Sequence, residues 1–218
     1  MNPGEGKTMR RNKIINAAEK LFFSKGYERS TMDDIAREAH FSKRTVYAYF
    51  NSKEQLHFEV MIRGYRQLIA MLKKEGKKTN DRPADGRLEQ MADTFYQFST
   101  DFPDYFAAIF SYENGESDFQ KGIPDQSREE CYKLGEDIFG MLTGLLREGQ
   151  EEGIFRNDLD PVKTAIVLWS CMVGVFHTSK VKANYFQNYH HTSSKDLFSG
   201  AFQMMIRSIQ NEGGGSPE

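Results

Sequence analysis

The spacing of apolar and polar residues along the chain predicts helices almost throughout. A first amphipathic segment ends at Lys25-Gly26, and shorter helical segments follow at residues 31–39 and 42–50. Ser52 and Gln55 have the spacing of a capping box, which predicts a fourth helix to about Leu72. Later periodic segments predict further helices over residues 87–101, 103–112, 124–152, 161–182 and 194–211.

Signals for β-strands are sparse, since β-branched runs and hairpin turn pairs are almost absent. The expected fold class is therefore all-α. A length of 218 residues allows two domains. We place a three-helix helix-turn-helix domain at residues 9–55 and a larger helical domain at residues 56–212. Residues 1–8, 73–86, 182–194 and 213–218 are expected to lie outside helices.

Charge is distributed unevenly along the chain, although the formal net charge is only -2. Residues 1–63 carry 12 Lys and Arg against 8 Asp and Glu, and the remainder carries 17 against 23. A basic head on an acidic body is expected when one end of a protein faces phosphates. An excess of this size is also common by chance, so it supports a nucleic-acid partner without requiring one.

The third predicted helix carries an unusual set of polar side chains. Residues 42–50 read Ser-Lys-Arg-Thr-Val-Tyr-Ala-Tyr-Phe, which puts two cations, hydroxyls and phenols on two helical turns. Together with residues 31–39 and a short turn, this segment forms a helix-turn-helix pattern. Val46 and Phe50 are expected to pack inward, which leaves the opposite face of the helix free to read base edges in the major groove.

The block from Arg10 to Leu56 resembles the DNA-binding domain of the TetR family of one-component transcriptional regulators. Two positions depart from the family pattern. His40 stands where glycine is usual in a turn position that often needs positive φ, and Phe41 replaces a small aliphatic residue. A second segment, Gly153 to Pro161, is similar to one that precedes the penultimate helix in many members. The matching sequences are Ile15-x-x-Ala18-x-x-Leu21-Phe22, Gly26-Tyr27, Thr31-Met32-Asp33-Asp34-Ile35-Ala36, Ser42-Lys43-x-Thr45-x-Tyr47-x-Tyr49-Phe50 and Ser52-Lys53-Glu54-x-Leu56.

The resemblance implies direct contacts to a double-stranded DNA operator. Lys43 and Arg44 are expected to donate to guanine O6 and N7, and Ala48 to offer its methyl group to thymine. Simpler interpretations remain for two other positions, namely a half-buried core residue at Tyr47 and a solvated first-turn residue at Lys53. The positions expected to hold phosphates or to present the second helix to the backbone are Thr31, Thr45, Tyr47, Tyr49 and Lys53.

The larger domain is dense in aromatic residues, and the resemblance implies that it binds an effector and dimerises. The same residues also suit a packed core, and for most of them that is the simpler interpretation. A pocket for a small apolar or aromatic effector is expected to be lined by Phe95, Phe98, Phe102, Phe106, Phe110, Trp169, Met172 and Phe176.

The resemblance also implies a homodimer in which helices 161–182 and 194–211 pair with their symmetry mates. A twofold dimer would present two recognition helices about one turn of DNA apart, which predicts a palindromic operator. The periodic apolar residues expected at this interface are Leu197, Phe198, Ala201, Phe202, Met205 and Ile209.

Other functions find little support in the sequence. No phosphate-binding loop, HExxH sequence, nucleophile elbow or metal-ligand cluster is found, so neither an enzyme nor a cofactor nor a metal is expected. Cys131 and Cys171 lie far apart and suit free thiols in a reducing cytoplasm. The apolar run from Ala165 to Phe176 is shorter than the roughly 20 residues that cross a bilayer, so a buried helix and no membrane partner are expected.

The expected function is a cytoplasmic DNA-binding transcriptional regulator, with a repressor released by a small-molecule effector as the first hypothesis. Two alternatives stay open from the sequence. One is a ligand-independent DNA-binding or nucleoid-associated protein on the same fold, and the other is a helical enzyme or small-molecule carrier.

Overall fold

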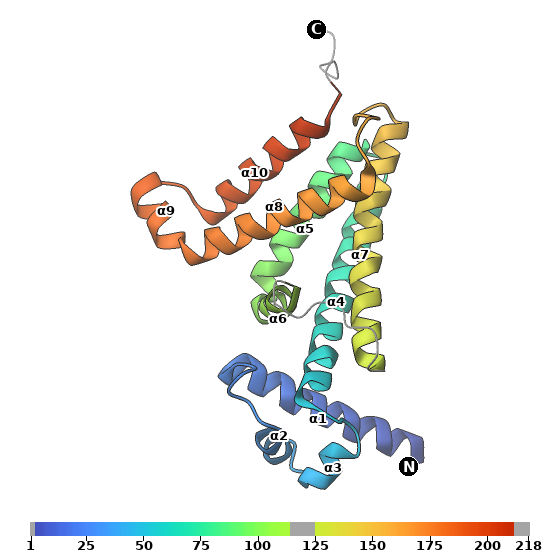
Figure 1. The fold of residues 1–218 in the computed structure, drawn as a ribbon, viewed down its shortest axis with the longest axis vertical. Coiled ribbons are helices and arrows are strands. Elements are labelled where there is room, and N and C mark those ends of the chain that lie inside the picture. The colour runs from blue at the N-terminus through green and yellow to red at the C-terminus, as the bar shows by residue number, and fades with distance from the viewer. Residues whose placement is uncertain (1–2, 114–124, 212–218) are drawn as a thin grey trace. The chain divides into compact units, whose positions relative to one another are not determined.

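The computed structural model describes residues 3–113 and 125–211, and these residues form a succession of α-helices (Figure 1). Within them the sole β-type pairing is an isolated bridge between Phe155 and Gln210. The expected all-α fold class is therefore confirmed. The helices are α1 (Pro3–Lys25), α2 (Met32–Glu38), α3 (Lys43–Tyr47), α4 (Lys53–Lys78), α5 (Ala84–Asp101), α6 (Pro103–Glu113), α7 (Gln126–Glu151), α8 (Pro161–Val181), α9 (Ala183–His190) and α10 (Ser194–Ile209).

Several boundaries differ from the predicted ones, and α5 begins at Ala84, inside the segment expected to lie outside helices. α1 already begins at Pro3, where a loose leader was expected, and proline is compatible with the first turn of a helix. α4 continues to Lys78, because Gly76 lowers helix propensity without ending the helix. α3 is shorter than predicted, since it ends at Tyr47 with Ala48 as its C-cap. The tail predicted over residues 213–218 lies outside the described residues.

α9 occupies residues for which a loop was predicted, and that prediction was wrong. None of its residues is buried, and the polar residues that surround its few aromatic side chains favoured a loop. The helix ends at His191, whose φ of 52° lies in the left-handed region. Thr192 N then donates to Phe186 O at 3.2 Å, which closes the helix end.

The chain packs as two compact units. One consists of Met1–Leu68 with Asp101–Gly135, and the other of Ile69–Thr100 with Glu136–Glu218. Both α4 and α7 contribute to both units. These packing units do not coincide with the predicted domains, which meet between residues 55 and 56. Packing alone does not test which residues bind DNA, so the predicted extent of the DNA-binding domain stays a prediction.

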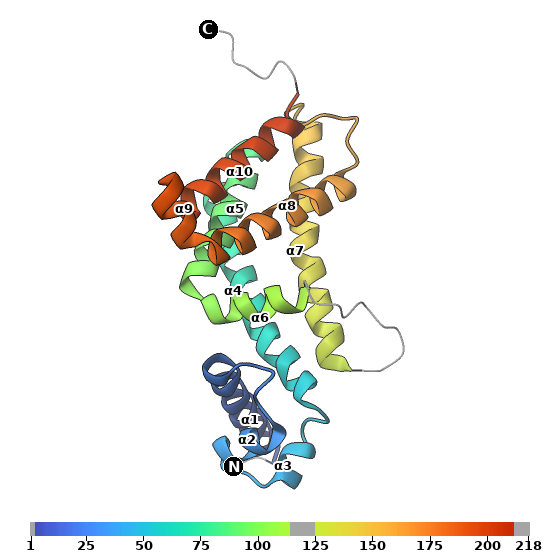
Figure 2. The same cartoon turned by 60° about the vertical axis from the view of Figure 1, so that its left-hand side comes forward.

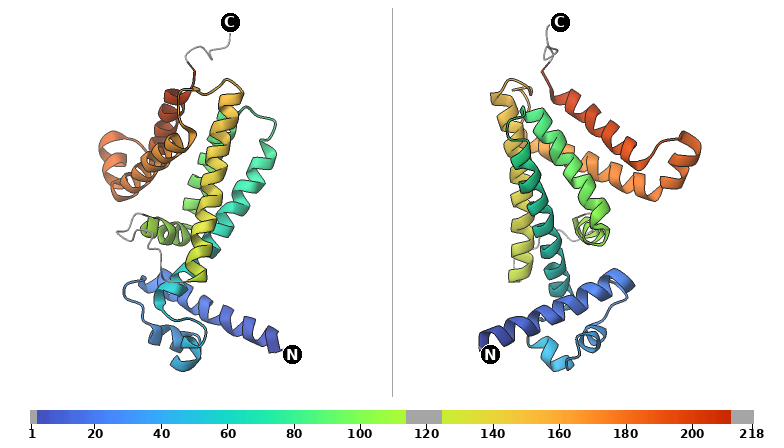
Figure 3. Two further views of the ribbon diagram at one scale, coloured as in Figure 1. Left: turned by 45° about the vertical axis from the view of Figure 1, so that its right-hand side comes forward. Right: turned by 180° about the vertical axis from the view of Figure 1, so that it is seen from behind.

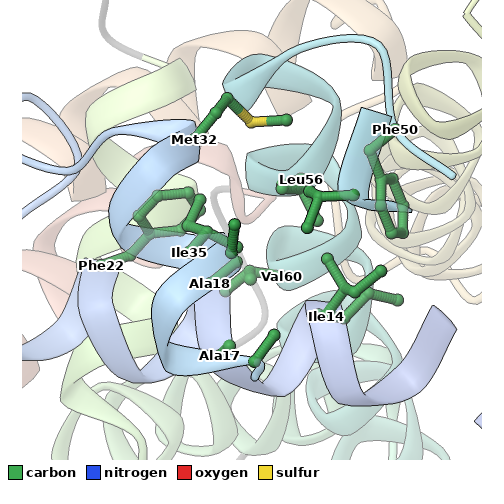
Figure 4. Close-up of a cluster of buried hydrophobic side chains, with 13 residues drawn as sticks. Ile14, Ala17, Ala18, Phe22, Met32, Ile35, Phe50, Leu56 and Val60 are labelled. Atoms are coloured by element: carbon green, nitrogen blue, oxygen red, sulfur yellow. The ribbon is translucent and has the colours of Figure 1, made fainter. Parts of the chain in front are cut away.

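The first unit has a hydrophobic core built from α1, α2, α3 and the start of α4 (Figure 4). α2 has seven residues and α3 has five, and isolated helices of that length are not stable in water. Shared burial therefore holds them in place. The core side chains with 0% exposure are Ile14, Ala18, Ile35, Val46, Leu56 and Val60.

The second unit has its own core, to which α5, α7, α8 and α10 contribute. α8 and α10 lie side by side, joined through α9 (Figures 2 and 3). Phe198 of α10 packs against Phe176 of α8, with ring centroids 4.6 Å apart. Burial of this kind along the whole length of α10 fixes the helical pair.

The segment between α7 and α8 folds back onto α7 at a glycine. Phe155 is 2% exposed, and its ring lies directly on Gly149. A Cβ at Gly149 would come within 2.1 Å of Phe155 Cδ2, so no larger residue fits without displacement. Gly153 turns the chain with a φ of 73°, and Phe155 then pairs with Gln210 beyond α10. The segment from Gly153 to Pro161, which resembles a family motif, therefore packs on α7 and on the end of α10 through Phe155.

His57 of α4 lies inside the aromatic part of the first core. Its ring centroid is 4.4 Å from that of Tyr27 and 5.7 Å from that of Phe22. Burial lowers the pKa of the imidazole to about 4, and the nearby Lys53 ammonium acts in the same direction. The folded chain therefore keeps His57 neutral at pH values where an unfolded histidine, with a pKa near 6.5, is already protonated.

This difference predicts a loss of stability in mild acid. The folded pKa is depressed, so the stabilisation is complete above pH 6.5 and is lost as the pH falls toward 4. Across that interval the free energy of unfolding should drop by about 2–3 kcal/mol on account of His57 alone. Denaturant unfolding followed by circular dichroism at pH 7, 5.5 and 4.5 measures it. The His57→Phe variant should lose this part of the slope, while His177→Gln, an exposed control, should keep it. Equal slopes in all three proteins would contradict the assignment.

Candidate nucleic-acid interface

The start of α2 is fixed by a reciprocal capping box. Asp34 N donates to Thr31 Oγ1 at 3.1 Å, and Thr31 N donates to Asp34 Oδ2 at 3.2 Å. Lys25 Nζ donates to the same carboxylate at 2.6 Å and, with the bonds from Thr31, lowers the pKa of Asp34 to about 2. Thr31 is exposed at this helix end, where the first backbone N–H groups can face an anion.

The turn between α2 and α3 passes through His40, whose φ is 57°. The sequence analysis expected positive φ at this position, and the structure confirms it. Phe41 N donates back to Ala36 O at 3.0 Å, which tightens the turn. The Phe41 side chain packs against the core of the first unit, so the residue that departs from the family pattern has a place among the apolar side chains.

α3 is held at its beginning by a cap and along one face by burial. Thr45 N donates to Ser42 Oγ at 3.1 Å, and the two hydroxyls are 2.8 Å apart. Val46 is 0% exposed and Phe50, just beyond the helix, is 1% exposed. Because both point into the core, the helix cannot rotate about its axis without losing their burial.

The opposite side of α3 is exposed to solvent. Lys43, Arg44, Tyr47 and Ala48 are all exposed, and 43% of Tyr47 is accessible. Tyr49 differs from these residues, because its ring is half-buried against the core of the first unit. The structure therefore brings four of the predicted DNA contacts onto one free surface and leaves Tyr49 half-buried beside them.

Lys43 has a partner within the helix-turn-helix. Its Nζ lies 2.8 Å from Asp33 Oδ1 of α2, and this hydrogen bond raises the pKa of the ammonium. Both side chains are about 60% exposed. An ion pair this exposed contributes little to stability, so another anion such as a phosphate can replace Asp33 at low cost. The sequence analysis missed Asp33 as a partner of Lys43.

Lys53 makes contacts inside the first unit that the sequence did not indicate. Its Nζ donates to Tyr27 O at 2.9 Å and lies 4.1 Å from the centroid of the Tyr27 ring. These contacts tie the start of α4 to the turn before α2. Because an ammonium has three N–H donors, these contacts do not exclude a further contact to a phosphate. That phosphate contact by Lys53 stays a prediction.

Two further ionic clusters join α1 to other helices of the same unit. In the first, the buried Glu59 of α4 accepts from Arg11 Nη2 and from Ser127 Oγ, each at 2.5 Å. The Arg11 guanidinium also lies 5.3 Å from the centroid of the Phe50 ring. Sequence spacing gives no sign of this cluster, because Arg11 and Ser127 are far apart along the chain.

In the second cluster, Glu19 of α1 accepts from Arg63 Nη1 at 2.9 Å and from Tyr105 Oη at 2.7 Å. Burial, followed by the bond to Glu19, raises the pKa of the Tyr105 phenol to about 12. α6 also approaches α4 closely, since a Cβ at Gly64 would lie 3.0 Å from Tyr105 Cβ. The helix-turn-helix is therefore attached to α6 by both charge and close packing within this unit.

The aromatic residues predicted to line an effector pocket fall in both units. In the second unit, the Phe95 and Trp169 ring centroids are 5.5 Å apart, and Phe98 is 1% exposed. In the first unit, the Phe106 and Phe110 rings stack at 5.5 Å. Contacts among rings are what a packed core also gives, so the lining of an effector pocket by these residues stays a prediction. The others in the set are Phe102 in the first unit and Met172 and Phe176 in the second.

The apolar stripe predicted for the dimer interface packs mainly within the chain. Phe198, Phe202 and Ile209 are 2%, 7% and 6% exposed, and all belong to the core of the second unit. Leu197, Ala201 and Met205 are partly exposed at the side of that stripe. The periodicity of α10 therefore reflects burial against α8, and these three deeply buried side chains offer no free surface to a second copy.

α8 is long and apolar enough to cross a membrane by length and composition, although only 22% of the relevant stretch is buried. The expectation of a fully buried helix was therefore wrong for a single chain. Ala165, Leu168 and Met172 face the core, while Ile166 and Val167 are 51% and 59% exposed.

Among the residues that the structure describes, no group of three or more His, Cys, Asp or Glu side chains could hold a metal ion.

Comparison with known proteins agrees with this geometry. Residues 14–60 match the family model described as bacterial regulatory proteins, tetR family. The chain is 25% identical over 151 residues to the HTH-type transcriptional repressor NicS of Pseudomonas putida. That alignment covers 68% of this chain and 67% of NicS. It is 32% identical over 89 residues to the HTH-type transcriptional activator FasR of Mycolicibacterium smegmatis, which covers 41% of this chain and 40% of FasR. The similarity to FasR thus spans less than half of either protein.

Solved structures extend the likeness over nearly the whole chain. A tetR family transcription regulator from Shewanella sp. PV-4 aligns with a TM-score of 0.67 at 18% identity, covering 93% of this chain and 99% of that one. A transcriptional regulator from Saccharomonospora viridis in complex with choline aligns with a TM-score of 0.63 at 16% identity, covering 94% and 100%. At such identities these structures establish the fold. The sequence match of residues 14–60, together with the exposed face of α3, identifies the N-terminal helix-turn-helix as a DNA-binding domain of the TetR family.

Proposed function

We propose that the protein is a homodimeric repressor that binds a palindromic operator in the cytoplasm and leaves it when a small-molecule effector binds. The observation that carries the proposal is the division of α3 into a buried and an exposed face. Val46 is fixed in the core, and Lys43, Arg44 and Ala48 are presented outward. Those outward residue types are suited to guanine and thymine edges in the major groove. NicS and KstR2 of Rhodococcus jostii are named repressors, which supports this sign of regulation over activation.

The exposed face of α8 and α10 supports the homodimer. Ile166 and Val167 of α8 and Met204 of α10 are 51%, 59% and 74% exposed. Gly174 and Gly200 are exposed on the same two helices and would allow close approach of a second copy. Large apolar side chains gathered on one face mark an interaction surface. This surface replaces the buried stripe of α10 as the proposed interface.

The first prediction concerns base reading by Arg44. Replacing Arg44 with alanine should reduce discrimination between the operator and a mismatched duplex by about 1–3 kcal/mol, roughly 5-fold to 150-fold in relative affinity. The physical reason is the loss of two donors that can bind guanine O6 and N7 together. Operators selected from random duplexes, followed by mobility shifts at fixed salt, provide the measurement.

Arg82→Ala is the matched control for this measurement. Arg82 is exposed and lies between α4 and α5, so its removal changes the net charge equally without touching α3. Affinity for all duplexes should then fall little, and discrimination should be unchanged. Base reading by Arg44 is wrong if the two variants discriminate equally well.

A second prediction concerns the dimer. Ile166→Asp should convert the protein to a monomer in sedimentation experiments, because a carboxylate would have to be buried between two copies. Operator affinity should fall by at least about 100-fold, since one head must then bind alone. Met9→Asp, on the exposed part of α1, serves as the control and should leave the dimer intact. A dimeric Ile166→Asp protein would contradict the proposed interface.

A further inference from the structure

The second unit contains a cavity that the sequence did not indicate. It has a volume of about 720 Å³ and lies between the last turns of α4, the first half of α5 and the second half of α7. Cavities that bind small molecules in proteins typically measure about 300–1,000 Å³. Residues 73–80, which were expected to form a loop, supply much of its wall. We call it the α4–α5–α7 cavity.

Glycines on two helices open this cavity. Gly76 of α4 and Gly140 and Gly144 of α7 line it, and a Cβ at any of the three would meet no heavy atom within 4 Å. Glycine in the interior of a helix is destabilising relative to alanine, and close packing does not require it at these positions. The absent side chains instead leave space along the cavity wall.

The wall is apolar at its buried side and cationic at its exposed side. Leu72 and Met91 are 7% and 9% exposed, and Met141 and Leu145 add partly buried apolar surface. Methionine side chains adapt to ligands of irregular shape. Lys73 and Lys77, one turn apart on α4, are exposed at the edge of the cavity.

The third cation of the lining, Arg87, is already neutralised. Its Nη1 lies 2.6 Å from Glu148 Oε2, and its Nη2 lies 3.0 Å from Glu152 Oε1. Glu148 is the one acidic residue among those that line the cavity. The charge left for a ligand is therefore that of Lys73 and Lys77, and it favours an anion.

An organic cation fits this cavity poorly. Sites for quaternary ammonium groups use the faces of aromatic rings. Among the described residues that line the cavity there is no Phe, Tyr, Trp or His. The choline bound by the regulator from Saccharomonospora viridis therefore offers no guide to the ligand of this cavity.

We infer that the α4–α5–α7 cavity binds an organic anion with a flexible aliphatic part, of the carboxylate class, and that this ligand is the effector. The carboxylate lies between Lys73 and Lys77, and the aliphatic chain lies against Leu72, Met91 and Met141. The regulatory half of this inference rests on the proposed repressor function, whereas the binding half does not. The sequence analysis led us to expect a small apolar or aromatic effector. We now infer an anionic ligand because Lys73 and Lys77 give the edge of the cavity a positive charge.

The test compares three ligands with the same ten-carbon chain on the DNA-free protein by calorimetry: decanoate, decanol and decyltrimethylammonium. Decanoate should bind at one molecule per chain and at least about 10-fold more tightly than the other two, because only it can pair with two ammonium groups. Lys73→Ala combined with Lys77→Ala should remove this preference. Lys74→Ala, an exposed lysine on the same helix that does not line the cavity, should keep it.

A second variant blocks the cavity without removing charge. Gly144→Leu should abolish decanoate binding while the melting temperature stays at or above that of the parent protein, because the space beside Gly144 is open. Equal affinity for decanoate and decanol, or equal effects of the Lys74 variant and the Lys73/Lys77 double variant, would overturn the assignment of the site.

The regulatory half is measured separately on the operator. Decanoate should release the parent protein from operator DNA and should fail to release the Gly144→Leu variant. Binding of decanoate that leaves operator affinity unchanged would overturn its role as effector. Operator binding by the unliganded protein reports on the proposed function by itself, so failure of that function is distinguishable from failure of the ligand site.

Discussion

The position of α3 depends on the burial of Val46 and Phe50, and the proposed recognition of DNA depends on the position of α3. A helix of five residues gains too little from its own hydrogen bonds to persist alone. Its two apolar side chains, at 0% and 1% exposure, fix it against α1, α2 and α4. Once that face is fixed, the Ser42 cap sets where the helix starts, and Lys43 and Arg44 are presented on the other side.

Within the unit that positions α3, a buried and a partly buried carboxylate connect α1 to more distant parts of the chain. Glu59 joins α1 to the first turn of α7 through Arg11 and Ser127, and Glu19 joins α1 to α6 through Tyr105. Removing one partner from such a cluster leaves a poorly solvated charge, which costs more than the intact contact contributes. These contacts give the helix-turn-helix a defined set of neighbours within its unit, through which a shift of α6 or α7 can reach α1.

Sequence reasoning succeeded where a local rule determines the structure. Spacing and residue type predicted the helix caps at Thr31 and Ser42 and the packing of Val46 into the core. They also indicated the left-handed turn at His40. It failed where burial depends on partners far along the chain. α9 is mostly polar and buries none of its residues, and the periodicity of α10 is the same whether it packs on α8 or on a second copy. The α4–α5–α7 cavity was not predicted because Gly76 lay in a segment expected to be a loop, and because its other lining residues are far apart along the chain.

The most direct test of the central claim is protection of guanine N7 from dimethyl sulfate on operator DNA, because N7 lies in the major groove. The account predicts two groups of protected guanines about 10 base pairs apart on the palindrome, one for each α3. Protection should disappear from both groups in the Arg44→Ala protein at concentrations that still saturate the DNA. Saturated operator DNA with every guanine N7 open to methylation would contradict the account, since binding would then occur without α3 in the major groove.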